Sequence, residues 1–169
     1  MTRCDLRVGV IGLGAMGLPM AANLRRANVP LRVHSRSRCA ERDQSLQGSI
    51  ACATPAEVAQ GVDVLLVCVS DNAAVEAVLF GANGASNQLA AGSVVVDCST
   101  IAPATAITSA QRLAQRGVHY LDAPVTGGTE GAKAGSLTVL VGGEPAALEH
   151  ARPVPVSYTH LTLPTILRV

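Results

Sequence analysis

Aromatic side chains are almost missing from this chain of 169 residues, which has two tyrosines, one phenylalanine and no tryptophan. Without aromatics beside clustered Lys and Arg, and with a net charge of +1, the chain lacks the stacking, basic face typical of nucleic-acid-binding proteins. Hydrophobic residues make up 49% of the chain and must build the core from Val, Leu, Ile and Ala. Such small aliphatic side chains suit buried parallel strands with helices packed closely on them. The length allows one domain with a sizeable core.

Cysteines at metal-binding spacing are also lacking. The five cysteines are scattered, with no CxxC pair and no histidine at ligand spacing: Cys4, Cys39, Cys52, Cys68 and Cys98. We therefore expect small buried thiols in a reducing compartment and no metal site. No signal peptide precedes the first predicted strand, and no apolar run is long enough to cross a membrane. The sequence thus predicts a cytoplasmic protein with no membrane partner.

Strands and helices alternate along the sequence. Short buried strands are predicted at residues 7–11, 31–34, 62–69, 93–97, 118–121 and 137–141. Helices are predicted at residues 16–27, after residues 70–72 (Ser-Asp-Asn, which can cap the next helix), at 103–115 and from Pro145. This alternation is typical of an α/β fold with a doubly wound, mainly parallel sheet, flanking helices and right-handed crossovers.

A glycine-rich turn follows the first predicted strand and opens the first helix. It reads Gly12, Leu13, Gly14, Ala15, Met16, Gly17, a GxGxxG pattern in strand–turn–helix context. Gly12 permits the tight turn, Gly14 lets the backbone approach a pyrophosphate, and Gly17 allows close helix–strand packing. The phosphates would then lie at the helix N-terminus, where free N–H groups favour negative charge. The turn predicts a Rossmann-type, dinucleotide-binding sheet.

The end of the second strand indicates which dinucleotide binds. NAD sites usually place Asp or Glu about twenty residues after the turn. Here residues 34–38 read His-Ser-Arg-Ser-Arg, with no carboxylate. The Ser35 hydroxyl and the Arg36 guanidinium would both bind a 2′-phosphate, which an acidic residue would repel. The sequence favours NADP, with NAD possible, and leaves open whether Arg38 takes part or is a solvated loop charge.

Three stretches in order resemble one family over residues 8–153. They are GLGAMGLPMAANL from Gly12, DCSTIAP from Asp97, and DAPVTGG from Asp122, with Thr126 where serine is commoner. Together they resemble the β-hydroxyacid dehydrogenase family, which includes 3-hydroxyisobutyrate dehydrogenases and tartronate semialdehyde reductases. The resemblance implies hydride transfer between NADP(H) and a small β-hydroxy acid or semialdehyde.

The same resemblance implies a set of site residues. It places the glycine turn 12–17 with Val69, Ser70 and Thr100 around the cofactor. It places Thr126, Gly127 and Gly128 on a small carboxylate substrate. A threonine hydroxyl and the N–H groups of two successive glycines are suitable partners for a carboxylate. Without the resemblance, residues 122–128 would be interpreted only as a loop between strands.

The general acid/base of the resembled family has no counterpart here. In that family a lysine on a later helix moves the proton, and an all-helical domain closes the site and builds the dimer. We expect that C-terminal all-α domain to be absent, so no catalytic residue is assigned, and the parent enzyme would be a homo-oligomer. Lys133, the one lysine, lies in the glycine-rich substrate stretch and is expected to face solvent. His34, His119 and His150 are expected at the surface. The alternatives are a non-catalytic NADP-binding module and a reader protein that lost the lysine.

The last stretch of the chain has a different composition. From Val156 to Val169 there is no Gly, Ala, Asp or Glu, although Gly and Ala are abundant before it. The string VSYTHLTLPT resembles a translated sequencing adapter. We therefore expect a NAD(P)-binding domain over residues 1–155 and a non-native tail over 156–169, making the chain a truncated, inactive fragment. The alternative is a short native β-tail.

Overall fold

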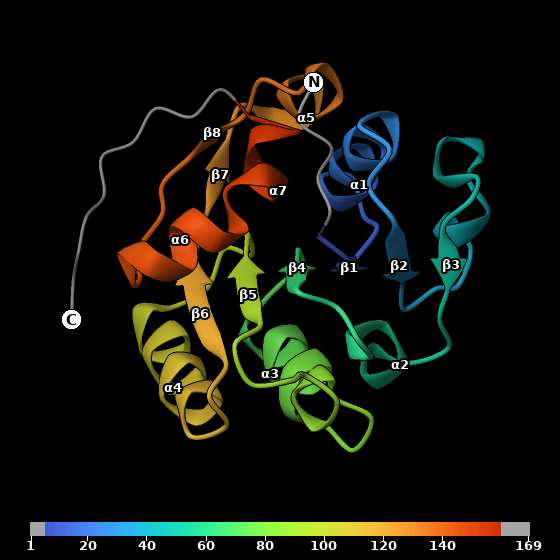
Figure 1. Ribbon diagram of the computed structural model, residues 1–169. Helices are drawn as coiled ribbons and strands as arrows, with labels where there is room; N and C mark the ends of the chain where they lie inside the picture. The colour runs from blue at the N-terminus through green and yellow to red at the C-terminus, as the bar shows by residue number, and fades with distance from the viewer. Residues whose placement is uncertain (1–5, 160–169) are drawn as a thin grey trace.

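The computed structural model describes residues 6–159 of the chain. Six parallel strands form one sheet in the order β3-β2-β1-β4-β5-β6 (Figure 1). Their bounds are β1 Val8–Ile11, β2 Leu31–His34, β3 Ile50–Ala51, β4 Val64–Val67, β5 Val94–Asp97 and β6 His119–Asp122. This order is that of doubly wound dinucleotide-binding sheets, whose ligands lie where the strand order reverses, here between β1 and β4. The predicted fold class is confirmed.

The three central strands are buried on both faces. Every residue of β1, β4 and β5 is buried, and their sequences are VGVI, VLLV and VVVD. Near-continuous β-branched and leucine runs are what a parallel sheet covered on both faces requires. The strands pair in register, Val8 with Val64 and Val64 with Val94, so their carboxyl ends finish together at one edge.

Helices cover both faces of the sheet. In Figure 1 α1, α5, α6 and α7 lie above it and α2, α3 and α4 below. Their bounds are α1 Gly17–Arg26, α2 Pro55–Ala59, α3 Asn72–Phe80, α4 Pro103–Ala114, α5 Gly128–Ala134, α6 Pro145–Ala151 and α7 Pro153–Val156, with 3-10 helices η1 Ala40–Arg42, η2 Gln44–Leu46 and η3 Ala85–Asn87. One buried cluster lies under each layer of helices. In the part of the chain that the structure describes, we find no helix that is long and apolar enough to cross a bilayer.

The predicted strand at residues 137–141 is wrong in length and partner. Only Thr138–Val139 forms a strand, β8, and it pairs antiparallel with β7 (Val125–Thr126) in a separate two-stranded sheet. The chain turns at Gly127 into α5 and comes back antiparallel along β7, and it meets the main sheet again only at Gly142, which pairs with Asp122 of β6. The sequence interpretation also missed α2, although the Thr54 hydroxyl accepts the Glu57 N–H and Pro55 begins the helix.

The described part of the predicted tail packs on the domain. Tyr158 is fully buried, and its carbonyl accepts the Leu137 N–H at 3.3 Å. The Thr159 hydroxyl donates to the Pro155 carbonyl at 2.7 Å. Residues 160–169 lie outside the described residues, and a separate origin for 156–169 stays a prediction.

Candidate functional site

The glycine turn is sterically required at two of its three glycines. Gly12 has φ +95°, and a Cβ there would overlap the carbonyl oxygen of Cys68. A Cβ on Gly17 would overlap the carbonyl oxygen of Gly12. Gly14 differs, because a Cβ there would meet nothing within 4 Å. Gly12 and Gly17 are thus required by the fold, whereas Gly14 leaves open space in front of the backbone.

The N-terminus of α1 is free to bind an anion. The Met16 side chain caps no backbone group, and the first turn holds no acidic residue. The first N–H groups of such a helix lack intrahelical partners and carry the positive end of the helix dipole. The Leu13 side chain is buried in the core, so at this position the backbone faces the turn. This turn fits the pyrophosphate of a dinucleotide.

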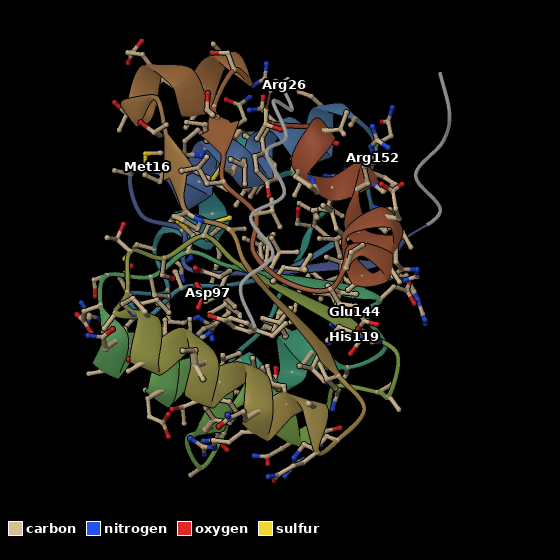
Figure 2. The ribbon with its side chains drawn as sticks, turned by 90° about the vertical axis from the view of Figure 1, so that its left-hand side faces the viewer. Met16, Arg26, Asp97, His119, Glu144 and Arg152 are labelled. Atoms are coloured by element: carbon tan, nitrogen blue, oxygen red, sulfur yellow. The ribbon has the colours of Figure 1, made fainter. Side chains whose placement is uncertain are left out.

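One cavity brings four of the predicted cofactor residues together with the three predicted substrate residues, while residues 12–15, Gly17, Ser35 and Arg36 are not in its lining. It has a volume of about 340 Å³ and lies at the carboxyl ends of β4 and β5. Its lining includes the predicted cofactor residues Met16, Val69, Ser70 and Thr100, and the predicted substrate residues Thr126, Gly127 and Gly128. Figure 2 shows Met16 beside the strand and helix that follow Val125. Residues that are more than a hundred positions apart in sequence therefore face one space.

A buried carboxylate holds the strand ends that line this cavity. Asp97, at the end of β5, accepts the Ser99 N–H at 2.9 Å and the Tyr120 hydroxyl at 2.8 Å. The Ser99 hydroxyl in turn accepts the Val69 N–H at 3.0 Å. This chain of hydrogen bonds connects the ends of β4 and β5 with Tyr120 inside β6. It fixes the loops that present Val69 and Thr100 to the cavity.

Stability is expected to depend on the protonation of Asp97. Burial raises its pKa above 3.8, against the opposing hydrogen bonds from Ser99 and Tyr120. The folded chain then binds this proton more tightly than the unfolded chain, so ionised Asp97 lowers stability as the pH rises from 3.8 through the raised pKa. In Asp97→Asn the amide oxygen still accepts the Ser99 N–H. In urea unfolding between pH 4 and 8, the free energy of unfolding of the variant should increase relative to that of the unmodified chain as the pH rises.

A matched variant should show the opposite sign. The Arg7 side chain, through its hydrogen bond, lowers the pKa of Asp63 below 3.8. Asp63→Asn therefore removes stability that is present above 3.8 and lost as the pH falls through the lowered pKa. Its difference from the unmodified chain should stay nearly constant between pH 4 and 8 and shrink only when the scan is extended below pH 3.8. A difference between Asp97→Asn and the unmodified chain that stays constant across the pH range would contradict the assignment.

The cavity also contains residues that the sequence interpretation missed: Cys68, Cys98, Ser99 and Val125. Each directly neighbours a motif residue at a strand end, and the general position of ligands at the carboxyl ends of parallel strands could have indicated them. Burial raises the pKa of the Cys68 thiol to about 11, so it is protonated at neutral pH and is no nucleophile. The expectation of buried thiols holds for Cys52 and Cys98, is met only in part by the half-buried Cys68, and is wrong for Cys39, which is exposed on the loop after β2. Cys4 lies outside the described residues.

The predicted substrate loop, residues 122–128, leads into α5 through two glycines in unusual conformations. Gly127 has φ +129° and Gly128 has φ +64°, both in the region that favours glycine. Thr126 is exposed and ends β7. Lys133 lies further along α5, pairs with Glu130 at 2.9 Å and is 65% exposed, which confirms that it faces solvent.

The loop after β2 contains a carboxylate that the sequence interpretation did not assign to it. Ser35 is buried and Arg36 is exposed, and Glu41 folds back from η1 onto Ser35. His34 is only 12% exposed, with Nδ1 bonded to the Cys52 carbonyl at 3.1 Å and 3.9 Å from Glu41, so the prediction of a surface residue is wrong for it. The His34 ring reaches the Cys52 carbonyl, which directly follows the neighbouring strand β3. The surface prediction is better for His119, which pairs with Glu144 at 2.9 Å on the side of Figure 2 away from Met16.

Comparison with known proteins matches the chain to a family of NAD binding domains and to part of several named dehydrogenases and reductases. Residues 7–161 match a family described as the NAD binding domain of 6-phosphogluconate dehydrogenase. The chain is 38% identical over 150 residues to 2-(hydroxymethyl)glutarate dehydrogenase of Eubacterium barkeri, covering 89% of this chain and 50% of that protein. It is 40% identical over 149 residues to 2-hydroxy-3-oxopropionate reductase of Escherichia coli (strain K12), covering 88% and 51%.

Solved structures agree in fold. A structure of Psf3 in complex with NADP+ and 2-OPP has a TM-score of 0.88 and 36% identity, over 94% of this chain and 57% of that one. The 3-hydroxyisobutyrate dehydrogenase of Mycobacterium tuberculosis with L-serine has a TM-score of 0.85 and 26% identity, over 93% and 53%. The chain spans about half the length of the curated relatives it matches.

Proposed function

The chain belongs to the family of the NAD binding domain of 6-phosphogluconate dehydrogenase, and on this premise we propose that it is the cofactor-binding half of a hydroxy-acid oxidoreductase. The reaction is hydride transfer between NADP(H) and a small β-hydroxy acid or the matching semialdehyde, of the 3-hydroxyisobutyrate dehydrogenase type. Relatives with the names of 2-hydroxy-3-oxopropionate reductase and 3-hydroxyisobutyrate dehydrogenase support this substrate class.

One observation supports the proposal above all others. The predicted cofactor residues Val69, Ser70 and Thr100 and the predicted substrate residue Thr126 line the same cavity. Hydride transfer requires the cofactor and the substrate carbon in contact in a space from which water is largely excluded. A cavity lined by both sets meets the first part of that requirement.

In the proposed reaction, residues of this chain bind and orient the cofactor and the substrate. The glycine turn 12–17 and the start of α1 hold the pyrophosphate, with Gly14 leaving the space for it. Val69, Ser70 and Thr100, which line the cavity, would hold the rest of the cofactor. The bound nicotinamide supplies or accepts the hydride. The Thr126 hydroxyl and the N–H groups of Gly127 and Gly128 hold the substrate carboxylate.

Proton transfer is not assigned to any residue of this chain. Lys133 points away to Glu130 in solvent, and no other lysine is present in the sequence. The chain as given therefore acts as a cofactor-binding unit, and turnover belongs to the complete enzyme. This observation also favours the second candidate function, a non-catalytic NADP-binding module, for the polypeptide by itself.

Titration calorimetry with NADPH and NADH tests the proposal. Arg36 is exposed at the end of β2, and hydrogen bonds to charged groups contribute about 1.5–3 kcal/mol each. Arg36→Ala should therefore weaken NADPH binding roughly tenfold to a hundredfold and change NADH binding by less than about twofold. Arg42→Ala, another exposed arginine of the same segment, is the matched control. Equal affinity of the unmodified chain for both cofactors, or tighter NADH binding, would overturn the NADP preference.

A further inference from the structure

The Glu41 carboxylate is nearly enclosed at the end of β2, although it belongs to an otherwise exposed loop. Its side chain is 3% exposed. One oxygen, Oε1, accepts the Ser35 N–H at 2.7 Å and lies 3.4 Å from the Ser35 hydroxyl. The other, Oε2, accepts Nε of Arg38 at 2.8 Å. Both oxygens thus have partners within the loop that follows β2.

These contacts involve only one of the two arginines of the loop. The Arg38 guanidinium is bound to Glu41, and its backbone has φ +59°, a conformation uncommon for a residue with a side chain. Arg36 is exposed, and among residues 6–159 no carboxylate lies within ion-pair distance of it. The pKa of Asp71 is lowered chiefly by the Ser70 hydroxyl and then by backbone N–H groups, and in small part by the charge of Arg36. Arg36 is therefore on the side of the loop that faces the start of α3.

The position of this loop is that of the adenosine ribose in a doubly wound sheet. The chain after β2 lies next to the turn after β1, because Ile11 pairs with His34 and the Gly12 N–H donates to the His34 carbonyl at 2.9 Å. In this fold the residues after the second strand contact the ribose hydroxyls or a 2′-phosphate. An enclosed carboxylate here adds negative potential where NADP brings its extra phosphate.

From these contacts we infer that Glu41 is a specificity-determining residue of the cofactor site, which sets the balance between NADP and NAD by withholding Arg38 from the 2′-phosphate. Arg36 is then the arginine offered to the phosphate, and Glu41 with Arg38 forms a neutral pair behind it. Glu41 cancels the charge of one of the two arginines, so the loop presents a smaller positive charge to the 2′-phosphate. The preference for NADP over NAD is therefore moderate. The inference rests on the proposed function, because it concerns the cofactor of that same site.

Glu41→Gln removes the negative charge of the side chain and keeps its size and shape nearly unchanged. The single amide oxygen of glutamine cannot accept both donors, and the buried Ser35 N–H retains it because an unpaired buried N–H is costly. Arg38 is released, and one negative charge is removed. Calorimetry on the full chain should show NADPH affinity rising about threefold to tenfold, with NADH affinity unchanged within about twofold.

Two further variants complete a double-mutant cycle. Arg38→Ala leaves the Glu41 charge uncompensated and should lower NADPH affinity severalfold. The double variant Glu41→Gln with Arg38→Ala should return close to the unmodified chain. Glu76→Gln breaks another Glu–Arg pair, with Arg112 at 2.7 Å between α3 and α4, and should change neither affinity.

The outcomes distinguish this inference from the proposed function. If the unmodified chain binds neither NADPH nor NADH, both are overturned. If it binds them but Glu41→Gln changes both affinities in parallel, Glu41 only anchors the loop and the inference alone fails. A fall in NADPH affinity alone, or no change at all, would equally overturn it.

Discussion

Replacing Gly12 by alanine is expected to abolish dinucleotide binding and to lower the free energy of unfolding by roughly 3 kcal/mol. Two physical effects add at this position. The backbone has φ +95°, where an L side chain is strained, and the new Cβ would overlap the carbonyl oxygen of Cys68. That carbonyl belongs to the backbone just after β4 and cannot move aside without disturbing the sheet. Chemical denaturation and calorimetry with NADPH measure the two losses separately.

Gly14→Ala is the matched control within the same turn. A Cβ there meets no protein atom within 4 Å, and its φ is not in the left-handed region. The variant should be as stable as the unmodified chain or gain up to about 1 kcal/mol through the unfolded state. Its methyl group would occupy the space assigned to the pyrophosphate, so NADPH affinity should fall at least roughly a hundredfold. Undiminished cofactor binding by Gly14→Ala would refute the placement of the pyrophosphate.

Replacing Tyr158 by alanine is expected to lower the free energy of unfolding by about 3–5 kcal/mol, the usual effect of removing a fully buried aromatic side chain. The residue is fully buried in the core beneath α1, α5 and α6, and its hydroxyl lies 3.9 Å from the Cys98 sulfur. The chain has very few aromatic residues, so no neighbouring ring can fill the space left behind. Urea unfolding monitored by circular dichroism measures the effect.

Two variants isolate the cause of the Tyr158 effect. Tyr158→Phe keeps the ring and loses only a weak contact with sulfur, so it should change stability by less than about 1 kcal/mol. Val156→Ala changes a side chain that is 50% exposed and should change stability by less than about 0.5 kcal/mol. A Tyr158→Ala effect as small as that of Val156→Ala would show that the ring is not part of the core in solution.

The same measurement bears on the domain boundary. We propose that the domain comprises residues 1–155 and that residues 156–169 are an appended segment of separate origin. Tyr158 then fills a gap that the core of residues 1–155 leaves open between Cys98 and Leu137. On this view a chain ending at Pro155 should lose at least as much stability as Tyr158→Ala, because it leaves the same cavity and also removes the carbonyl that accepts the Leu137 N–H.

Much of the fold could be predicted from local sequence alone. The runs VGVI, VLLV and VVVD can be buried only in a sheet covered on both faces, and the glycine turn permits few other backbone paths. Pro103 and the Asp71 cap likewise begin their helices by local chemistry. These features depend on residues within one turn or strand, so the sequence contains their cause. The two-residue strands β3, β7 and β8 depend on distant partners and were missed or misjudged.

The candidate site shows the same division. The sequence by itself determined the glycine turn, because its motif has its own geometry. Ser70, Thr100 and the glycines at 127 and 128 were predicted as site residues only through the family resemblance. Only the tertiary structure decided that these motifs line one cavity, since parallel strands in register finish at one edge. It also decided that Glu41 pairs with Arg38 and Ser35, because a 3-10 turn folds the carboxylate back over the end of β2. Glu41 is only six residues from Ser35 in sequence, yet its carboxylate reaches the end of β2 only because the chain turns back there.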